Sequence, residues 1–244
     1  MCNFKYMTKD KKILVFSACY NEKENIKNLI YGIKENLPNS SILIIDDSSP
    51  DKTIDVIKDL QKTVTNINLI VRKNKLGLDT AHRMAYEYAV LNNFEYLITM
   101  DADLSHDPKD LINIVKYLKD NPFVIGSRYI AGGRCLMKTS RLLISKYGNL
   151  LIKKISGINC NEFTTSYRGF NILKLKDFSL KNVRAKGYSF FMGTLFEIEK
   201  RGFLIKEIPI IFKDREKGVS KISKIEIFRT MKNLLVLSLK KYLN

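Results

Sequence analysis

The distribution of hydrophobic residues along the first half of the chain predicts alternating strands and helices. Short apolar and β-branched runs, typical of buried strands, occupy residues 13–16, 41–45, 67–71, 96–100 and 123–125. Longer segments with apolar residues at helical spacing separate them, at about residues 23–36, 52–64, 78–92 and 108–120. This order predicts crossover connections onto a mainly parallel central sheet flanked by helices, which is an α/β fold.

Polar residues follow several of these strands at the point where each strand ends. Tyr20 and Glu22 come after the first strand, Asp47 after the second, and Asp101 and Asp103 after the fourth. The carboxyl ends of parallel strands share one edge of a sheet, and ligands of such folds bind there. We therefore expect the three loops to meet at one ligand site.

The regular alternation ends after Arg128. A loop with Gly132 and Gly133 leads to a basic helix from about residue 139, and residues 205–212 have the pattern of one strand. The second half therefore follows a different plan from the first.

The end of the chain repeats apolar residues at helical spacing, over residues 222–239, with Lys and Arg between them. Such a helix can lie on a membrane surface or pack against its own domain, and the pattern does not decide between these alternatives. We expect one domain over residues 1–221 and a basic amphipathic tail over residues 222–244.

The charge balance restricts the partners that the chain can bind. Lys and Arg number 42 against 25 Asp and Glu, a formal charge of +17, which favours nucleic acid, anionic lipid or phosphorylated substrates. A hydrophobic content of 45% is that of a globular protein and excludes disorder of the whole chain.

The cysteines and the hydropathy indicate a cytosolic location. Four cysteines lie far apart without metal-ligand spacing, so we expect reduced thiols: Cys2, Cys19, Cys135 and Cys160. The basic N-terminus lacks the apolar stretch of a signal peptide. No segment approaches the roughly 20 apolar residues that span a bilayer, so we expect no membrane crossing by this chain alone.

The acidic triplet Asp101-Ala102-Asp103 is a candidate metal site. Two carboxylates flank a small residue directly after a predicted strand, so both can face the same side of a tight turn. Their hard oxygens suit Mg²⁺ or Mn²⁺, which phosphate oxygens can share. Acidic pairs at strand ends also occur as solvated turns or helix caps, so the triplet alone does not decide the matter.

Several segments together resemble family-2 glycosyltransferases, and within them the dolichol-phosphate mannose synthases. The matching segments are Tyr20-Asn21-Glu22 with Glu24-Asn25, residues 46–53, Leu76-Gly77-Leu78, residues 100–108, Gly126-Ser127-Arg128-Tyr129, Ser166-Tyr167-Arg168 and residues 186–190. They follow the family's order from about residue 13 to 221. The resemblance implies a catalytic domain of the GT-A nucleotide-sugar-binding type, GDP-mannose as donor and dolichyl or polyprenyl phosphate as acceptor.

The resemblance also implies roles for residues on the donor side. The donor's guanine and ribose would lie against Ala18, Tyr20, Glu22, Ile45 and Asp47. From the residues alone, the structural interpretations are favoured, with Tyr20 as a core aromatic and Glu22 as a carboxylate at a helix start. Metal and diphosphate would be held by a second group, namely Asp101, Ala102, Asp103 and Ser105.

Basic residues further along the chain complete the site that the resemblance implies. Arg128 would contact donor and acceptor phosphates, and Arg215 and Lys221 would close over the diphosphate. Arg141 and Ser145, four residues apart on one helical face, correspond to a segment that grips the acceptor phosphate, although a merely charged, exposed helix is the competing interpretation. Of all these residues, the resemblance gives the catalytic role to Asp103, Arg128 and Arg215.

The chain departs from the family's pattern at several positions. It has Ala18 for proline, Cys19 for threonine, Asp79 for glycine, Lys146 for arginine, Glu162 for aspartate and Gly193 for glutamate. These changes leave the metal site intact and leave a sugar other than mannose open.

The acceptor decides whether a general base is required. A lipid phosphate attacks as an anion, because the second pKa of a phosphomonoester is about 6, so no base is needed. A hydroxyl acceptor would need one, and His106 and Asp107 lie in the right part of the sequence. Asp107 before Pro108 also reads as a helix cap, and His106 as a loop residue with a structural hydrogen bond.

Two rival interpretations remain. A family-2 enzyme using UDP-glucose, UDP-N-acetylglucosamine or a hydroxyl acceptor would keep the donor half of the site. A nucleic-acid-binding protein would explain the charge but leave the acidic triplet without a purpose, so we expect no nucleic acid partner. We expect peripheral contact with the cytoplasmic face of a membrane through the basic tail, with room for a small membrane partner protein.

Overall fold

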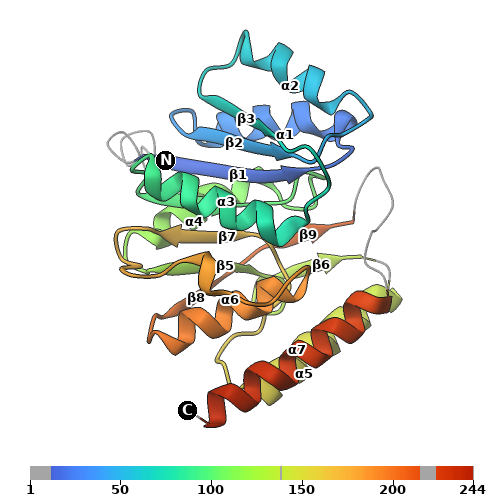
Figure 1. The fold of residues 1–244 in the computed structure, drawn as a ribbon, viewed down its shortest axis with the longest axis vertical. Coiled ribbons are helices and arrows are strands. Elements are labelled where there is room, and N and C mark those ends of the chain that lie inside the picture. Colours follow the sequence, from blue (N-terminus) through green and yellow to red (C-terminus); the bar gives the residue numbers. More distant parts are fainter. Residues whose placement is uncertain (1–11, 138, 215–223, 244) are drawn as a thin grey trace.

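The centre of the molecule is a seven-stranded sheet with the order β3-β2-β1-β4-β7-β5-β8 (Figure 1). The computed structural model describes residues 12–137, 139–214 and 224–243. The strands of this sheet are β1 (Ile13–Cys19), β2 (Ser41–Asp46), β3 (Ile67–Val71), β4 (Tyr96–Thr99), β5 (Phe123–Ser127), β7 (Arg168–Asn171) and β8 (Ile205–Pro209). Only β7 runs antiparallel to its neighbours, so the predicted mainly parallel sheet is confirmed.

Helices cover both faces of the sheet. They are α1 (Lys23–Asn36), α2 (Thr53–Gln61), α3 (Leu78–Leu91), α4 (Leu111–Leu118), α5 (Thr139–Ser156), α6 (Ser189–Lys200) and α7 (Lys224–Leu243), with 3₁₀ turns at Pro108–Asp110 and Leu180–Asn182. Val15 and Ile44 face a hydrophobic cluster with α1 and α4, whereas Phe16 and Ile45 face a second cluster with α3 and α6. Alternate side chains therefore enter different cores, which explains why the strands are apolar throughout.

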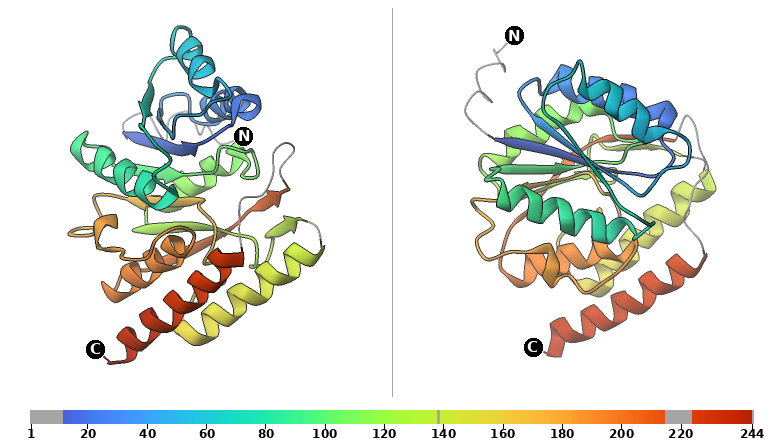
Figure 2. Two further views of the ribbon diagram at one scale, coloured as in Figure 1. Left: turned by 45° about the vertical axis from the view of Figure 1, so that its right-hand side comes forward. Right: turned by 45° about the horizontal axis from the view of Figure 1, so that its top comes forward.

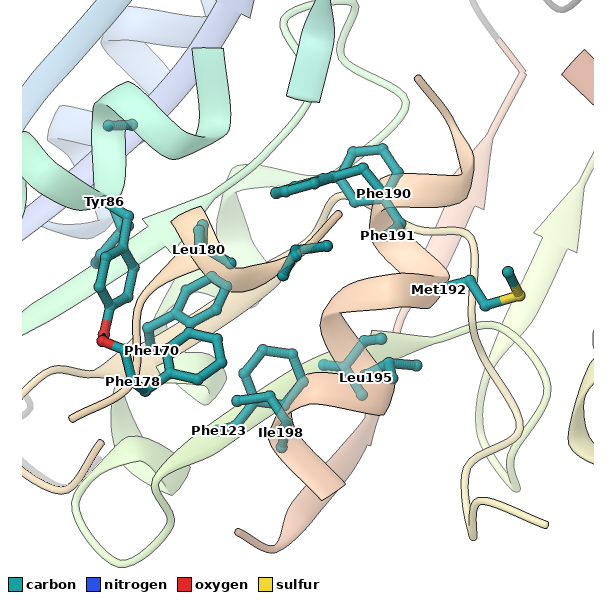
Figure 3. Packing of buried hydrophobic residues seen from close by; sticks show 14 of the residues in the cluster. Tyr86, Phe123, Phe170, Phe178, Leu180, Phe190, Phe191, Met192, Leu195 and Ile198 are labelled. Atoms are coloured by element: carbon teal, nitrogen blue, oxygen red, sulfur yellow. The ribbon is translucent and has the colours of Figure 1, made fainter. Parts of the chain in front are cut away.

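An aromatic cluster joins the two halves of the chain (Figure 3). Phe170 of β7 meets Phe123 of β5 at 5.0 Å and Tyr86 of α3 at 5.7 Å between ring centroids. Phe178 lies 5.5 Å from Tyr86. Edge-to-face pairs of this kind contribute about 0.5–1.5 kcal/mol beyond their buried area. The second half of the chain therefore shares the core of the first.

The expected single strand over residues 205–212 is wrong, because two strands of different sheets occupy this segment. β8 pairs with β5, whereas β9 (Ile211–Lys213) pairs with β6 (Arg134–Leu136) in a two-stranded sheet. Pro209 has no backbone N–H to continue the ladder. Ile210 then bridges both sheets, since its N–H donates to Ser127 O and its carbonyl accepts from Arg134 N.

The last helix packs against its own domain, which is one of the two alternatives left open by the sequence. Leu234 of α7 is fully buried, and Asn233 Nδ2 donates to Ser189 Oγ of α6 at 2.6 Å. Lys241 Nζ donates to the carbonyl of Ser156 at the end of α5. α7 and α5 lie side by side along one edge of the molecule (Figure 2). Within the described residues, no helix has the length and hydropathy that crossing a bilayer requires.

Candidate active site

The loops after β1 and β2 are locked together by side chain to backbone hydrogen bonds. Ser49 Oγ accepts from Asn21 N at 2.9 Å and donates to Asp46 Oδ2 at 2.7 Å. Thr53 Oγ1 accepts from Glu22 N at 3.0 Å. Asp46 is thus a buried support of the loop, whereas Asp47 joins the two loops only through its backbone, since its N–H donates to the carbonyl of Cys19 at 3.1 Å.

Asp47 is held instead by an arginine that the sequence did not single out. Arg72 Nε donates to Asp47 Oδ1 at 2.5 Å, and the same guanidinium donates to Thr80 Oγ1 and to the carbonyl of Gly77. Gly77 has φ +92°, a conformation that side chains rarely adopt. Arg72 therefore ties Asp47 to the start of α3. Its position directly after β3, at the same sheet edge, is the signal that could have revealed it.

The residues predicted for the nucleoside lie on β1 and β2 or just after these strands. Ala18 and Ile45 are register partners on β1 and β2, so their backbones lie directly side by side. Tyr20 is half-buried, and Lys75 Nζ lies 4.1 Å from its ring centroid. Glu22 accepts a hydrogen bond from Asn25 Nδ2 at 2.8 Å. A partly exposed aromatic ring next to carboxylates suits a base and ribose, and the roles of these residues stay a prediction.

The acidic triplet lies after β4, across the point where the strand order reverses. β1 pairs with β2 on one side and with β4 on the other, which is where ligands bind in open α/β sheets. Asp101 Oδ1 accepts from Ser166 Oγ at 2.5 Å. Asp103 Oδ1 accepts from Ser105 Oγ at 2.6 Å and from Ser105 N at 3.1 Å. The triplet is thus a hydrogen-bonded turn, in which the central Ala102 is buried.

His106 supports this turn as a neutral side chain. The N–H of Asp101 donates to His106 Nδ1 at 3.1 Å, so the ring proton must be on Nε2, which lies 3.1 Å from Thr165 Oγ1. Burial lowers the pKa of His106 below its ordinary value. Both nitrogens are therefore occupied, in agreement with a structural hydrogen bond rather than a general base.

Asp107 is also engaged elsewhere. Its Oδ1 accepts from Lys109 N at 3.0 Å and caps the 3₁₀ turn Pro108–Asp110, as the cap interpretation predicted. Its Oδ2 lies 3.4 Å from Lys213 Nζ. Both candidates for a base thus already have partners within the fold.

The donor atoms of the triplet fit a divalent cation that phosphates also bind. The side chain of Asp101 is 34% exposed, and Asp103 and Ser105 lie beside it with carboxylate and hydroxyl oxygens. Across the described ranges, no group of three or more His, Cys, Asp and Glu could hold a metal ion by itself. Mg²⁺ is commonly held by one or two carboxylates together with substrate phosphates and water. The residues present match that arrangement better than a closed structural site.

Arg128 follows β5 and forms a buried ion pair. Its Nε and Nη2 donate to the two oxygens of Glu162 at 2.6 and 2.8 Å, and Nη2 also donates to Thr164 Oγ1. Burial alone would raise the pKa of Glu162, but the charge and hydrogen bonds of Arg128 outweigh it and hold that pKa below its ordinary value. Arg128 is therefore fixed in direction, and its charge is balanced.

The two acceptor residues predicted on α5 have different partners. The Tyr129 hydroxyl, next to Arg128 in sequence, donates to Ser145 Oγ at 2.7 Å. Arg141 Nη1 pairs with Asp214 Oδ1 at 3.2 Å. Ser145 is thereby joined to the loop after β5. Arg141 is joined to Asp214, the residue directly after β9.

β9 itself lies next to the loop that follows the acidic triplet. Lys213 N donates to the carbonyl of Ser105 at 3.1 Å, and the Phe212 ring lies 5.3 Å from His106 and 5.0 Å from the Arg128 guanidinium. Arg215 and Lys221, predicted to close over a diphosphate, lie outside the described residues. Their roles stay predictions.

One departure from the family's pattern has a visible structural role. Asp79 accepts from Gly187 N and pairs with Arg83, whose Nη2 donates to the carbonyls of Val183 and Ala185. The start of α3 is thereby tied to the segment before α6. A glycine at position 79 could not make this connection.

The comparisons with known proteins agree with this geometry. The sequence profile described as Glycosyl transferase family 2 matches residues 14–178, and the chain belongs to this family. It is 32% identical over 213 residues to the undecaprenyl-phosphate mannosyltransferase of Micrococcus luteus, covering 87% of this chain and 88% of that one. It is 31% identical over 224 residues to the polyprenol monophosphomannose synthase of Mycolicibacterium smegmatis, covering 91% and 84%. The chain is thus related to polyprenyl-phosphate mannose synthases.

Solved structures show that the fold is of the GT-A type. A glucosyl-3-phosphoglycerate synthase from Mycobacterium tuberculosis, in complex with Mn²⁺, UDP-glucose and phosphoglyceric acid, superposes with a TM-score of 0.68 at 13% identity, over 97% of this chain and 82% of that one. A mannosyltransferase from Pyrobaculum calidifontis, in complex with GDP-Man and Mn²⁺, gives 0.59 at 20% identity, over 95% and 64%. Nucleotide sugars and Mn²⁺ are thus bound by proteins of this fold.

Proposed function

We propose that the protein transfers mannose from GDP-mannose to dolichyl or polyprenyl phosphate, with inversion at the anomeric carbon. The observation that carries the proposal is the acceptor side of the site. Ser145 accepts from Tyr129, which follows Arg128, and Arg141 lies on the same helix as Ser145, whereas both His106 nitrogens are occupied. Cations without a poised base suit an acceptor that is already an anion. The two mannosyltransferase relatives support the choice of mannose and of a lipid phosphate.

Donor binding would use the ends of β1, β2 and β4. Tyr20, Glu22 and Asp47 would hold the nucleoside, beside Ala18 and Ile45. Asp101, Asp103 and Ser105 would hold Mg²⁺ or Mn²⁺. When bound, the ion would neutralise charge on the donor diphosphate.

The reaction then consists of a displacement between two anions. An acceptor phosphate oxygen forms the bond to the anomeric carbon as the bond to the diphosphate oxygen breaks, and the electron pair leaves with GDP. An α-linked donor thus gives a β-linked mannosyl phosphate. The work of the protein is to hold two repelling anions in line and to stabilise the departing charge.

The positively charged residues divide this work. Arg128 is directed by Glu162, so it can meet a phosphate without reorganising. Arg141 and Ser145 would orient the acceptor phosphate, and Arg215 and Lys221 would close over the diphosphate. Since the lipid tail stays in a bilayer, we place the protein at the cytoplasmic face of a membrane, with a small membrane partner protein as an optional attachment and no role for nucleic acid.

A donor and acceptor panel tests this function. The protein is incubated with Mg²⁺ or Mn²⁺ and labelled GDP-mannose, UDP-glucose or UDP-N-acetylglucosamine, each with polyprenyl phosphate or with free mannose as a hydroxyl acceptor. We expect organic-extractable label from GDP-mannose and polyprenyl phosphate only. Label from a UDP-sugar would overturn the donor, and label on free mannose alone would overturn the acceptor.

A further inference from the structure

Helices α5 and α7 carry many of the exposed large hydrophobic residues of the molecule. Ile144, Tyr147 and Leu150 of α5 are 64%, 63% and 60% exposed, although they are large hydrophobic residues. We call the full set the two-helix face: Leu143, Ile144, Tyr147, Leu150, Leu151, Leu235, Val236 and Leu239. The two helices lie side by side (Figure 2), so these exposed hydrophobic residues belong to neighbouring helices rather than to scattered parts of the fold.

The exposed hydrophobic residues of α5 lie on the side of the helix that faces away from the candidate active site. The exposed residues 143, 147, 150 and 151 recur at three- and four-residue intervals, which is one side of a helix. The opposite side is turned inward, where Asn149 and Ile152 are buried and Ser145 accepts from Tyr129. α5 therefore lies between the candidate acceptor site and the outside.

The charge of the two helices indicates what covers the surface. α5 has four basic residues and no acidic one, and α7 has five basic residues and one acidic one. On α7, the exposed Arg229 and Lys232 precede the exposed Leu235, Val236 and Leu239 along the helix. An apolar face bordered by Lys and Arg matches the interface of an anionic bilayer. Two copies of this face would instead bring like charges together.

We propose that the two-helix face docks on an anionic lipid bilayer, with α5 and α7 lying in the headgroup region. The proposal deepens the proposed function. The docking itself is independent of that function, and only its consequence for catalysis rests on it. Docking through the outer side of α5 holds the inner side, with Arg141 and Ser145, at the depth of lipid phosphate groups. The acceptor phosphate then reaches the site while its tail stays in the bilayer.

Vesicle binding without any acceptor lipid tests the docking. The full chain is mixed with phosphatidylcholine vesicles containing phosphatidylglycerol, and the bound fraction is measured by flotation. We expect the double variant Ile144→Gln/Leu150→Gln to lower the partition coefficient at least about tenfold. The matched control Leu91→Gln/Leu204→Gln removes two leucines that are 78% and 73% exposed outside the two-helix face, and should bind like the wild type. Equal binding by both double variants would overturn the proposal.

The charge requirement has its own comparison. Lys146→Gln/Lys154→Gln on α5 should weaken binding to the anionic vesicles, whereas Lys27→Gln/Lys58→Gln on α1 and α2 should not, although all four lysines are exposed. The same loss from both pairs would indicate attraction by net charge alone and would overturn the two-helix assignment. Sedimentation equilibrium tests the rival occupant. A dimer that Ile144→Gln/Leu150→Gln dissociates, without vesicle binding by the wild type, would identify a second copy of the chain and overturn the bilayer.

The docking and the proposed function fail in different experiments. The vesicles contain no polyprenyl phosphate, so absence of mannose transfer would leave the flotation result standing. Conversely, Ile144→Gln/Leu150→Gln should still transfer mannose to a short, water-soluble prenyl phosphate while losing at least about tenfold in rate on acceptor embedded in vesicles. Equal loss on both acceptors would overturn the separation of docking from catalysis.

Discussion

Arg128 and Glu162 form a two-point ion pair in which both side chains are almost completely buried, with N to O distances of 2.6 and 2.8 Å. The pair orients the guanidinium and balances its charge. The position of the Arg128 side chain therefore depends on Glu162 as well as on β5. The family's pattern has aspartate at this position, and the longer glutamate side chain here still reaches the guanidinium with both oxygens.

Removing the negative charge of Glu162 should destabilise the fold. Glu162→Gln leaves Arg128 buried without a counter-charge, and we expect the free energy of unfolding at pH 7 to fall by about 3–5 kcal/mol in urea titrations. The pKa of Glu162 is lowered in the fold, so the advantage of the wild type exists above the unfolded pKa of about 4.3 and is lost as the pH falls through the folded pKa. Glu199→Gln, which loses a partly exposed pair with Lys241, should cost at most about 1 kcal/mol. Equal costs for the two variants would contradict this account.

Ser166 should act on the metal site through Asp101. Ser166→Ala removes the hydrogen bond that fixes Asp101 Oδ1, and we expect Mn²⁺ to bind about tenfold more weakly in the presence of GDP. Electron paramagnetic resonance of free Mn²⁺ measures this without turnover. Ser179→Ala, which removes a hydrogen bond to Lys181 N away from the site, is the matched control. Unchanged Mn²⁺ affinity in Ser166→Ala would argue against Asp101 as a ligand.

Arg141 should affect the acceptor more than the donor. Arg141→Gln should raise the KM for polyprenyl phosphate about tenfold, with the KM for GDP-mannose little changed, because a charge-assisted hydrogen bond to phosphate is lost. Asp214→Asn breaks the same ion pair from the other side and should not raise the acceptor KM. If both variants raise it equally, the ion pair matters only for structure.

His82 should make stability depend on pH. Burial, assisted by the positive charges of Arg168 and Arg83, lowers the pKa of His82 to about 3. Below pH 6.5 the unfolded chain binds a proton at this residue, whereas the folded chain does not. The free energy of unfolding therefore decreases as the pH is lowered. From pH 7 to pH 5 this contribution amounts to about 2 kcal/mol. In denaturant titrations, the free energy of unfolding of His82→Leu should decrease from pH 7 to pH 5 by that much less than that of the wild type. The same pH dependence in both proteins would contradict the assignment.

The sequence predicted the parts of the fold that depend on local pattern. Strands over residues 41–45 and 67–71 appear as runs of β-branched residues, and the structure places them within one residue of the prediction. The antiparallel strand Arg168–Asn171 has four residues and includes arginine and glycine, so no apolar run revealed it. β9 has three residues and follows Pro209, so it merged with β8 in the pattern.

Position at the strand ends alone predicted that the carboxylates of the candidate site would meet, whereas the other predicted residues rested on the resemblance to the family. Asp47, Asp101 and Asp103 follow strands, and strand ends of a parallel sheet converge without any knowledge of tertiary contacts. Their partners come from far along the chain. Arg72 is 25 residues from Asp47, and Ser166 is 65 residues from Asp101. Such pairings depend on the packed sheet and its crossovers, which spacing in the sequence does not encode.

The most direct test of the proposed chemistry measures mannose transfer to polyprenyl phosphate from labelled GDP-mannose by wild type and Asp103→Asn, each with Mn²⁺ and with a chelator. Asp103→Asn keeps the size of the side chain and an oxygen for Ser105 but removes the negative charge that we propose holds the metal ion. We predict an organic-extractable β-mannosyl phosphate lipid from the wild type with Mn²⁺, and at least about a hundredfold less from the variant or with the chelator. Wild-type rates from Asp103→Asn, or no lipid product from the wild type with Mn²⁺, would contradict the account.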